Sequence, residues 1–223
     1  MSLLMLRLEL LSDTLIGSGE GWGASIDRDV VFDDIGLPYI PARRVKGCLR
    51  ESATEVVEMF EISGIGTASN EDIEVLFGKP GQDQPCILSF SSCYLKEYDS
   101  NKKWLEWLIK KYPDFFSKEI ILSTFSITRQ QTAIDSNGIA KDHSLRTSRV
   151  LTKGNAFFGE IETANEIEER LLSFLALTVR NLRYIGTNRN RGFGSIKCNL
   201  LNDRGIALEE KYLIDLENKI KEA

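Results

Sequence analysis

Two stretches of helical apolar spacing, far apart in the sequence, most constrain how this chain can fold. The first stripe lies in residues 43–60 and comprises Val45, Leu49, Ala53, Val56 and Phe60. The second lies in residues 165–180 and comprises Ile167, Leu171, Leu172, Leu175 and Val179. Apolar residues at this spacing predict amphipathic helices that each bury one face. Both helices therefore need an apolar surface to pack against.

Strand-like segments on either side of the two helices offer that surface. Alternation or apolar richness predicts strands at 3–11, 86–95, 155–161 and 192–200. The order β-α-β-β-α-β is typical of a ferredoxin-like fold, in which two helices cover one face of an antiparallel sheet and the open face can bind RNA. We predict an α+β fold with a ferredoxin-like, RRM-like core. We expect one domain over residues 1–223, ending in a charged helix over about 207–221.

A long segment between the second and third strands has no place in such a core. We predict an insertion over about 100–153. Within it, residues 104–108 fit a short amphipathic helix, and the β-branched run 120–127 predicts an extended segment. Residues 128–153 are polar and carry Asn137-Gly138, a hairpin-turn signal. This last part predicts a projecting arm.

Cysteine and apolar content exclude several classes of protein. The four cysteines form no CxxC pair, and the chain has one histidine, so neither predicts a zinc site. Reduced, mostly buried thiols fit better. No segment has the features of a signal peptide, and no apolar run reaches the roughly 20 residues of a membrane span. We therefore expect a soluble cytoplasmic protein with no membrane partner.

Charge is unevenly distributed along the chain. The net charge of −5 and the pI near 5.2 argue against a polyanionic partner when taken alone. Residues 39–50 and 180–197, however, contain cations and no acid, whereas acidic residues gather at 51–74, 158–170 and 207–222. Such segregation predicts basic surfaces on an acidic body, although ordinary solvated faces are the alternative.

Two basic motifs are candidate phosphate-binding sites. The segment 40–47 opens a helix with Pro41, and a helix N-terminus offers free N–H groups to an anion. The segment 186–194 combines glycines, which let a ligand approach the backbone, with arginines and asparagines that donate hydrogen bonds. An exposed surface loop is the alternative for this second motif. The RNA-binding candidates are Arg43, Arg44, Lys46, Arg50, Arg146, Arg149, Arg189, Arg191, Gly192 and Gly194.

A glycine-dense stretch at 17–23 precedes a run of aspartates. It formally matches the dinucleotide fingerprint, but no helix follows it to receive a pyrophosphate. The aspartates at 27, 29, 33 and 34 lack the spacing and the terminal Glu of a calcium loop. Asp27, just past the glycines, is placed to approach a phosphodiester or hydrated magnesium, with a loop-capping role as the alternative. His143 has no companion for a catalytic triad.

Taken in order, these motifs resemble the type III CRISPR backbone subunits of the RAMP superfamily. In the first half the resemblance rests on the glycines at 17–23, Ile26-Asp27, Pro38-Tyr39-Ile40-Pro41 and Lys46-Gly47-Cys48-Leu49-Arg50. It continues through Leu76-Phe77-Gly78, the segment 88–95, Arg129 to Asp135, Ala140, Gly154 to Phe157 and Arg191-Gly192-Phe193-Gly194. The motifs span nearly the whole chain.

The resemblance implies a subunit that grips the backbone of a guide RNA, contacts other effector subunits and stacks with copies of itself or related subunits. It implies that the arm is a thumb that displaces one base at regular intervals. It also implies cleavage of the paired target RNA by Asp27, with Mg²⁺ or another divalent cation as cofactor.

The sequence departs from the family pattern at two places. Leu15 stands where the family often has His, and Pro41-Ala-Arg-Arg-Val-Lys-Gly47 replaces Pro-Gly-Ser-Ser-Leu-Lys-Gly. Three alternatives stay open: a non-catalytic RNA-binding scaffold of the same complex, a repeat-processing endoribonuclease, and a structural protein without nucleic acid.

Overall fold

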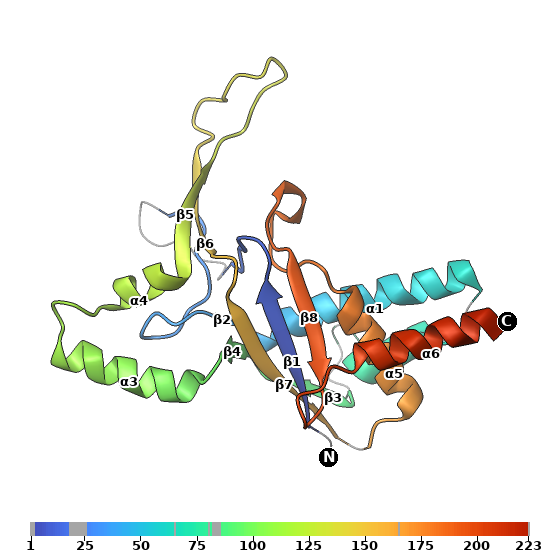
Figure 1. Cartoon of the computed structure of the whole chain (residues 1–223). Helices are drawn as coiled ribbons and strands as arrows, with labels where there is room; N and C mark the ends of the chain where they lie inside the picture. Colours follow the sequence, from blue (N-terminus) through green and yellow to red (C-terminus); the bar gives the residue numbers. More distant parts are fainter. Residues whose placement is uncertain are drawn as a thin grey trace.

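The computed structural model describes residues 3–17, 26–64, 66–79, 81, 86–164 and 166–222. Figure 1 shows a twisted sheet with helices packed on one side and a long arm projecting from one end. Most of the glycine stretch at 17–23 lies outside the described residues. Among the helices that are described, none has the length and apolarity needed to cross a lipid bilayer.

The elements follow each other in a mixed order. The first half contains β1 (Leu3–Leu10), β2 (Tyr39–Ile40), α1 (Ala42–Ser63), α2 (Asn70–Phe77), β3 (Leu88–Phe90) and β4 (Cys93–Leu95). The middle contains α3 (Tyr98–Lys111), α4 (Lys118–Phe125), β5 (Ser126–Gln131) and β6 (Arg146–Leu151). The last part contains β7 (Ala156–Thr163), α5 (Glu169–Asn181), the short 3₁₀ helix η1 (Arg189–Arg191), β8 (Ile196–Leu201) and α6 (Glu209–Glu222). The predicted α+β class is confirmed.

The main sheet has the strand order β2-β4-β7-β1-β8, with β3 also pairing with β7. Its pairings are antiparallel, and β1 lies between β7 and β8. With α1 and α5 as connections, the order β8-β1-β7-β4 has the connectivity expected of the βαββαβ core. The predicted strand over 86–95 is two short strands. Between them, the Ser91 hydroxyl accepts a bond from the Glu160 amide at 2.7 Å.

One face of the sheet is buried beneath α1 and α5. The even-numbered leucines of β1, from Leu4 to Leu10, are buried, and the odd-numbered residues between them are not. The predicted stripes of α1 and α5 contribute Leu49, Val56 and Leu175 to the same core. Full burial of one such side chain contributes roughly 1.5–3 kcal/mol, so these matched faces account for the position of both helices.

Residues 118–125 form the helix α4, so the extended segment predicted over 120–127 is wrong except at residues 126–127, which begin β5. The Ser117 hydroxyl accepts a hydrogen bond from the Ile120 amide at 3.3 Å and caps the helix. Ile121 and Leu122 are buried, Ile121 against a small second core that includes Ile35. Capping and tertiary packing therefore outweigh the strand propensity of the isoleucines.

Helix α2 was not predicted, although its first residues carry a signal for it. Ser69 precedes the helix, and the Asp72 carboxylate accepts a bond from the Ser69 amide at 2.8 Å, which forms a capping box. The helix is short, and its Ile73, Leu76 and Phe77 are buried. With so few turns, the apolar period is too brief to stand out in the sequence.

The arm consists of β5, β6 and the loop between them. Its strands pair antiparallel from Ser126↔Leu151 out to Gln131↔Arg146. Near the tip, the Asp135 carboxylate accepts bonds from the Asn137 and Ile139 amides, both at 2.9 Å, around the Asn-Gly turn. The arm leaves the body at the end of the sheet where η1 also lies (Figure 1).

The cysteine thiols are free, as expected. Cys48, Cys93 and Cys198 are buried, and Cys86 is half-buried. Burial raises the pKa of Cys48, that of Cys93 to about 12, and that of Cys198. These three thiols are packing groups rather than nucleophiles at neutral pH.

Candidate nucleic-acid interface

A groove of about 800 Å³ lies between the arm and the loop that contains η1. The arm and the segment paired with it contribute Arg28, Gln131, Thr132, Ala133, Ser144, Arg146 and Ser148, and the loop contributes Asn188, Arg189, Asn190 and Arg191. Four of these residues are arginines, and no lining residue in the described part of the chain is acidic. Concentrated positive charge in a concave surface raises the local concentration of polyanions. We call this surface the arm groove.

Glycines with positive φ set the shape of the η1 wall. At Gly194, with φ +78°, an added Cβ would collide with the Ile185 carbonyl oxygen. The Gly194 amide donates to the main-chain carbonyl oxygen of Asp13 at 3.0 Å, and the Gly194 carbonyl accepts from the Ile185 amide at 2.8 Å. Gly194, an RNA-binding candidate, thus has both main-chain groups engaged inside the protein. Gly192 ends η1 with φ +81° and open space around it.

The two arm arginines among the candidates have different surroundings. Arg146 lines the arm groove and is 63% exposed. Arg149 donates to Asp29 at 3.1 Å, and their side chains are only 18% and 4% exposed. Burial raises the pKa of Asp29, while the Val30 amide and Arg149 lower it. Arg149 is therefore held in an internal ion pair.

The basic residues at the start of α1 do not line the arm groove. Arg44 donates to the Gly17 carbonyl at 3.1 Å, and Arg50 to the Gly78 carbonyl at 2.6 Å. Lys46 lies 3.2 Å from the Cys86 sulfur, and Arg43 is exposed. An ion pair of 3.3 Å joins Glu51, the residue after the first predicted basic stretch, to Arg189 of the second. Cys48 of the first stretch also lies beside Arg183 and Arg189 of the second around a small pocket.

Asp27 lies at the base of the arm, not in a cluster of acids. Its Oδ2 accepts a bond from the Thr147 amide at 2.8 Å, its own amide donates to the Thr147 carbonyl at 2.9 Å, and its Oδ1 is 3.7 Å from Arg146. Its side chain is 41% exposed.

A metal-binding role for Asp27 needs further oxygen ligands. Magnesium is usually held by one or two carboxylates together with waters and substrate phosphates. Nowhere in the described ranges do three His, Cys, Asp or Glu side chains come together as a ligand set. These residues therefore do not fit a metal ion held by the protein alone. Cleavage through Asp27 and a divalent cation stays a prediction.

Sequence reasoning missed Arg28, which stands between two aspartates and looks like an ordinary solvated residue. It pairs with Ser148 through a parallel bridge, and its main-chain oxygen accepts from the Arg149 amide at 2.9 Å. This pairing places its side chain along the arm groove. The only sequence signal was a cation next to a glycine-rich segment, which is too weak to single it out.

A second groove of about 460 Å³ lies against the arm on the β5 side. Arg129, Lys153 and Arg191 line it, and Arg129 pairs with Asp13 at 2.6 Å. Arg191 lines both grooves. Basic surface therefore continues from the arm groove past the end of the η1 loop.

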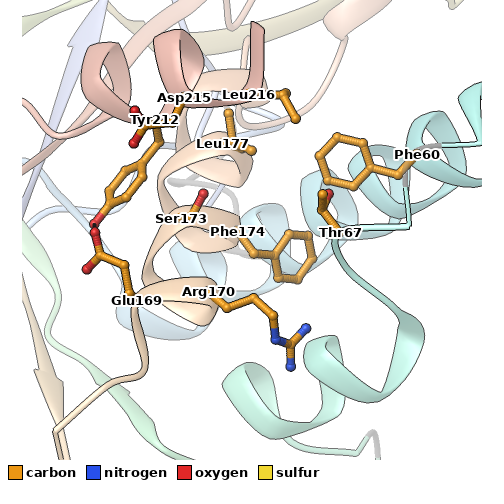
Figure 2. Close-up of a pocket in the computed structure, with 10 residues that line it drawn as sticks. All are labelled: Phe60, Thr67, Glu169, Arg170, Ser173, Phe174, Leu177, Tyr212, Asp215 and Leu216. Atoms are coloured by element: carbon orange, nitrogen blue, oxygen red, sulfur yellow. Dashed lines mark hydrogen bonds between the residues drawn. The ribbon is translucent and has the colours of Figure 1, made fainter. Parts of the chain in front are cut away.

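The pocket in Figure 2 has a different character. It has a volume of about 200 Å³ and lies between α1, α5 and α6. Arg170, at its edge, binds Asp72 through two bonds of 2.7 and 2.8 Å, and Glu169 binds Lys211 at 2.7 Å. Arg170 and Glu169 are thus already paired within the protein.

The open face of the sheet is not basic. Glu160 and Glu162 of β7 are exposed there, opposite Met5 and Leu3 of β1. Arg7, on the same face, is paired with Glu9 at 2.8 Å. The two basic grooves therefore lie at the end of the sheet, not on the face expected to serve as an RNA platform.

Comparisons with known proteins agree with this architecture. The model of the RAMP superfamily matches residues 7–197. A chain in the cryo-EM structure of the Type III-B Cmr-beta bound to cognate target RNA superposes with a TM-score of 0.65 at 12% identity, covering 90% of this chain and 97% of that chain. A chain in the apo-state structure of Type III-B Cmr-beta gives 0.61 at 14% identity, covering 91% and 98%. A comparison with curated protein sequences gives no match. The family match spans most of the chain, which therefore belongs to the RAMP superfamily.

Proposed function

We propose that this protein binds a strand of RNA in the arm groove, as a subunit of a type III CRISPR effector complex. The observation that carries the proposal is the groove itself, with four arginines and no acid among its described lining residues. Membership of the RAMP superfamily and the likeness to a Cmr-beta chain from an RNA-bound assembly support it.

The chemistry of the lining suits a sugar-phosphate backbone. Arginine makes short, often bidentate hydrogen bonds to phosphate oxygens, and release of counterions from RNA adds to the affinity. Gln131, Asn188 and Asn190 add amides that donate and accept hydrogen bonds. Single-stranded RNA presents its base edges to such groups, so a guide RNA or its target is the ligand class we propose.

Exposed aromatic residues on and after α3 suit contact with another protein subunit. Trp104, Trp107 and Phe115 are exposed on and after α3, on the far side of the arm from η1 (Figure 1). Aromatic residues are enriched in protein–protein interfaces, so this surface supports contact with another subunit. We propose that the chain stacks with copies of itself or with related RAMP subunits along the guide.

The test is RNA binding by the full chain as a function of salt. Replacing both Arg28 and Arg191 with Ala should weaken binding of single-stranded RNA roughly 100-fold, because each removes a charge-assisted bond. The slope of log affinity against log salt should fall by about 1.4, from about 0.7 for each lost phosphate contact. Lys103→Ala, in exposed α3, is the matched control. Unchanged affinity and slope in the double variant would reject the groove as the RNA site.

A further inference from the structure

Asp27 forms hydrogen bonds to β6 of the arm through both its side chain and its main chain. Both its carboxylate and its amide bond to the main chain of Thr147, and the neighbouring Arg28 carbonyl accepts from Arg149. These bonds make the segment that begins at Ile26 a third strand-like partner of the arm. A carboxylate that joins two main-chain segments stabilises their relative position, whereas one presented to solvent is available to a ligand.

Two further aspartates tie the arm to the body, in their case through arginine side chains. Asp13 accepts from Arg129 of β5 at 2.6 and 3.2 Å. Asp29 accepts from Arg149 of β6 at 3.1 Å, in the most buried of the three ion pairs. Each strand of the arm is therefore anchored by a carboxylate from the N-terminal part of the chain.

The anchored arm supplies one wall of the arm groove. Arg146 and Ser148 of β6 face Arg189 and Arg191 of η1 across it. Beyond its base, the arm projects away from the body (Figure 1). Its tilt, and with it the separation of Arg146 from Arg189 and Arg191, depends on the bonds at the base.

We propose that Asp27 is a positioning residue, which fixes the arm at Thr147 and thereby sets the width of the arm groove. Asp13 and Asp29 fix the remaining sides of the base. For its effect on RNA the inference rests on the proposed function, whereas its effect on the arm does not. It assigns Asp27 a task other than the cleavage that the family resemblance implies.

Hydrogen exchange of the full chain without RNA tests the positioning role directly. In Asp27→Ala the Thr147 amide loses its acceptor, so its exchange should accelerate at least about tenfold, with a smaller rise at Arg149. Asp27→Asn keeps an acceptor oxygen and should stay within about threefold of the unmodified protein. Asp203→Ala, in the exposed turn before α6, is the control. Equal protection of Thr147 in Asp27→Ala and in the unmodified protein would overturn the inference.

RNA retention and cutting by the assembled complex separate positioning from catalysis. Asp27→Ala should lose RNA about tenfold faster, and Asp27→Asn should restore both retention and any cutting of target RNA to within about threefold. Equal loss of cutting in both variants, with RNA retention intact, is the result of a catalytic carboxylate and would overturn the inference. Failure of the Arg28 and Arg191 variants to change RNA binding would reject the proposed function alone, since the exchange result is measured without RNA.

Discussion

The arm groove and the pocket beneath α6 differ in their charged lining residues: those of the groove are all arginines, whereas the pocket has Glu169, Arg170 and Asp215. In the pocket, Arg170 is bound through two nitrogens to Asp72. In the groove, Arg28 and Arg191 have no ion-pair partner within the described ranges, and the walls carry no acid. Paired charge stabilises the protein itself, whereas clustered unpaired charge attracts an external anion.

This difference is more informative than net charge. The chain carries −5 overall, yet its acids and bases are separated in space, so one end of the sheet is basic. Arginine count already separates the two hollows, because four arginines line the arm groove and one lines the pocket. The acids separate them too, because two acids line the pocket and none of the described residues that line the groove is acidic.

The largest expected effect is at Gly194, where the groove wall meets the core. Gly194→Ala combines left-handed backbone strain with a collision against the Ile185 carbonyl, so the free energy of unfolding should fall by roughly 3 kcal/mol. Denaturant unfolding measures it. Gly192→Ala, with similar φ and open space, should cost about 1 kcal/mol. Equal costs would mean that the close approach at Gly194 does not shape the wall.

Next in size is loss of the paired charge beside the pocket. Asp72→Asn removes the Arg170 ion pair and weakens the α2 cap, so the free energy of unfolding at pH 7 should fall by about 2 kcal/mol. Solvent screening of the half-exposed Arg170 keeps the loss from being larger. RNA affinity should not change, as measured on the same samples. A loss of RNA affinity here would break the comparison between the two hollows.

The same pair gives a pH dependence. Hydrogen bonding by Arg170 holds the pKa of Asp72 below its usual value, while burial opposes this. Its contribution to stability is therefore present above the unfolded pKa of about 3.9 and lost as pH falls through the lower folded pKa. Acid unfolding curves should show this loss in the unmodified protein and lack it in Asp72→Asn.

A smaller effect is expected from one unpaired arginine. Arg191→Ala should weaken RNA binding about tenfold, or about 1.4 kcal/mol, and leave the free energy of unfolding within about 0.5 kcal/mol. Arg170→Ala should do the reverse, reducing stability and sparing RNA binding. Titration with labelled single-stranded RNA and thermal unfolding of both variants measure the contrast. If both lost RNA equally, the two hollows would not differ in function.

The smallest effect concerns Glu51, the one acid that reaches a groove arginine from α1. Glu51→Gln releases Arg189, so RNA affinity should rise about twofold while stability changes by less than about 0.5 kcal/mol. Glu58→Gln, exposed on the same helix, is the control. A fall in RNA affinity would show that Glu51 holds Arg189 in place for RNA rather than away from it.

The core was predictable because its signals are local and repeated. The stripes of α1 and α5 and the alternation of β1 span enough residues to indicate both the element and its buried face. Helix α4 was not predictable in this way, because its eight residues are rich in isoleucine and its burial depends on Ile35, far away in the sequence. The secondary structure of a short segment depends more on the residues it packs against than on its own propensity.

By itself, the sequence determined the class of fold, the polar arm and the two basic stretches, since each follows from residues that are neighbours along the chain. Only the tertiary structure decided which cations face the groove. Arg28 and Arg149 are the same residue type, yet Arg28 lines the groove and Arg149 is half-buried and paired with Asp29. The electrostatic environment of a side chain depends on charges within a few ångströms, and in this protein those charges come from segments more than a hundred residues apart.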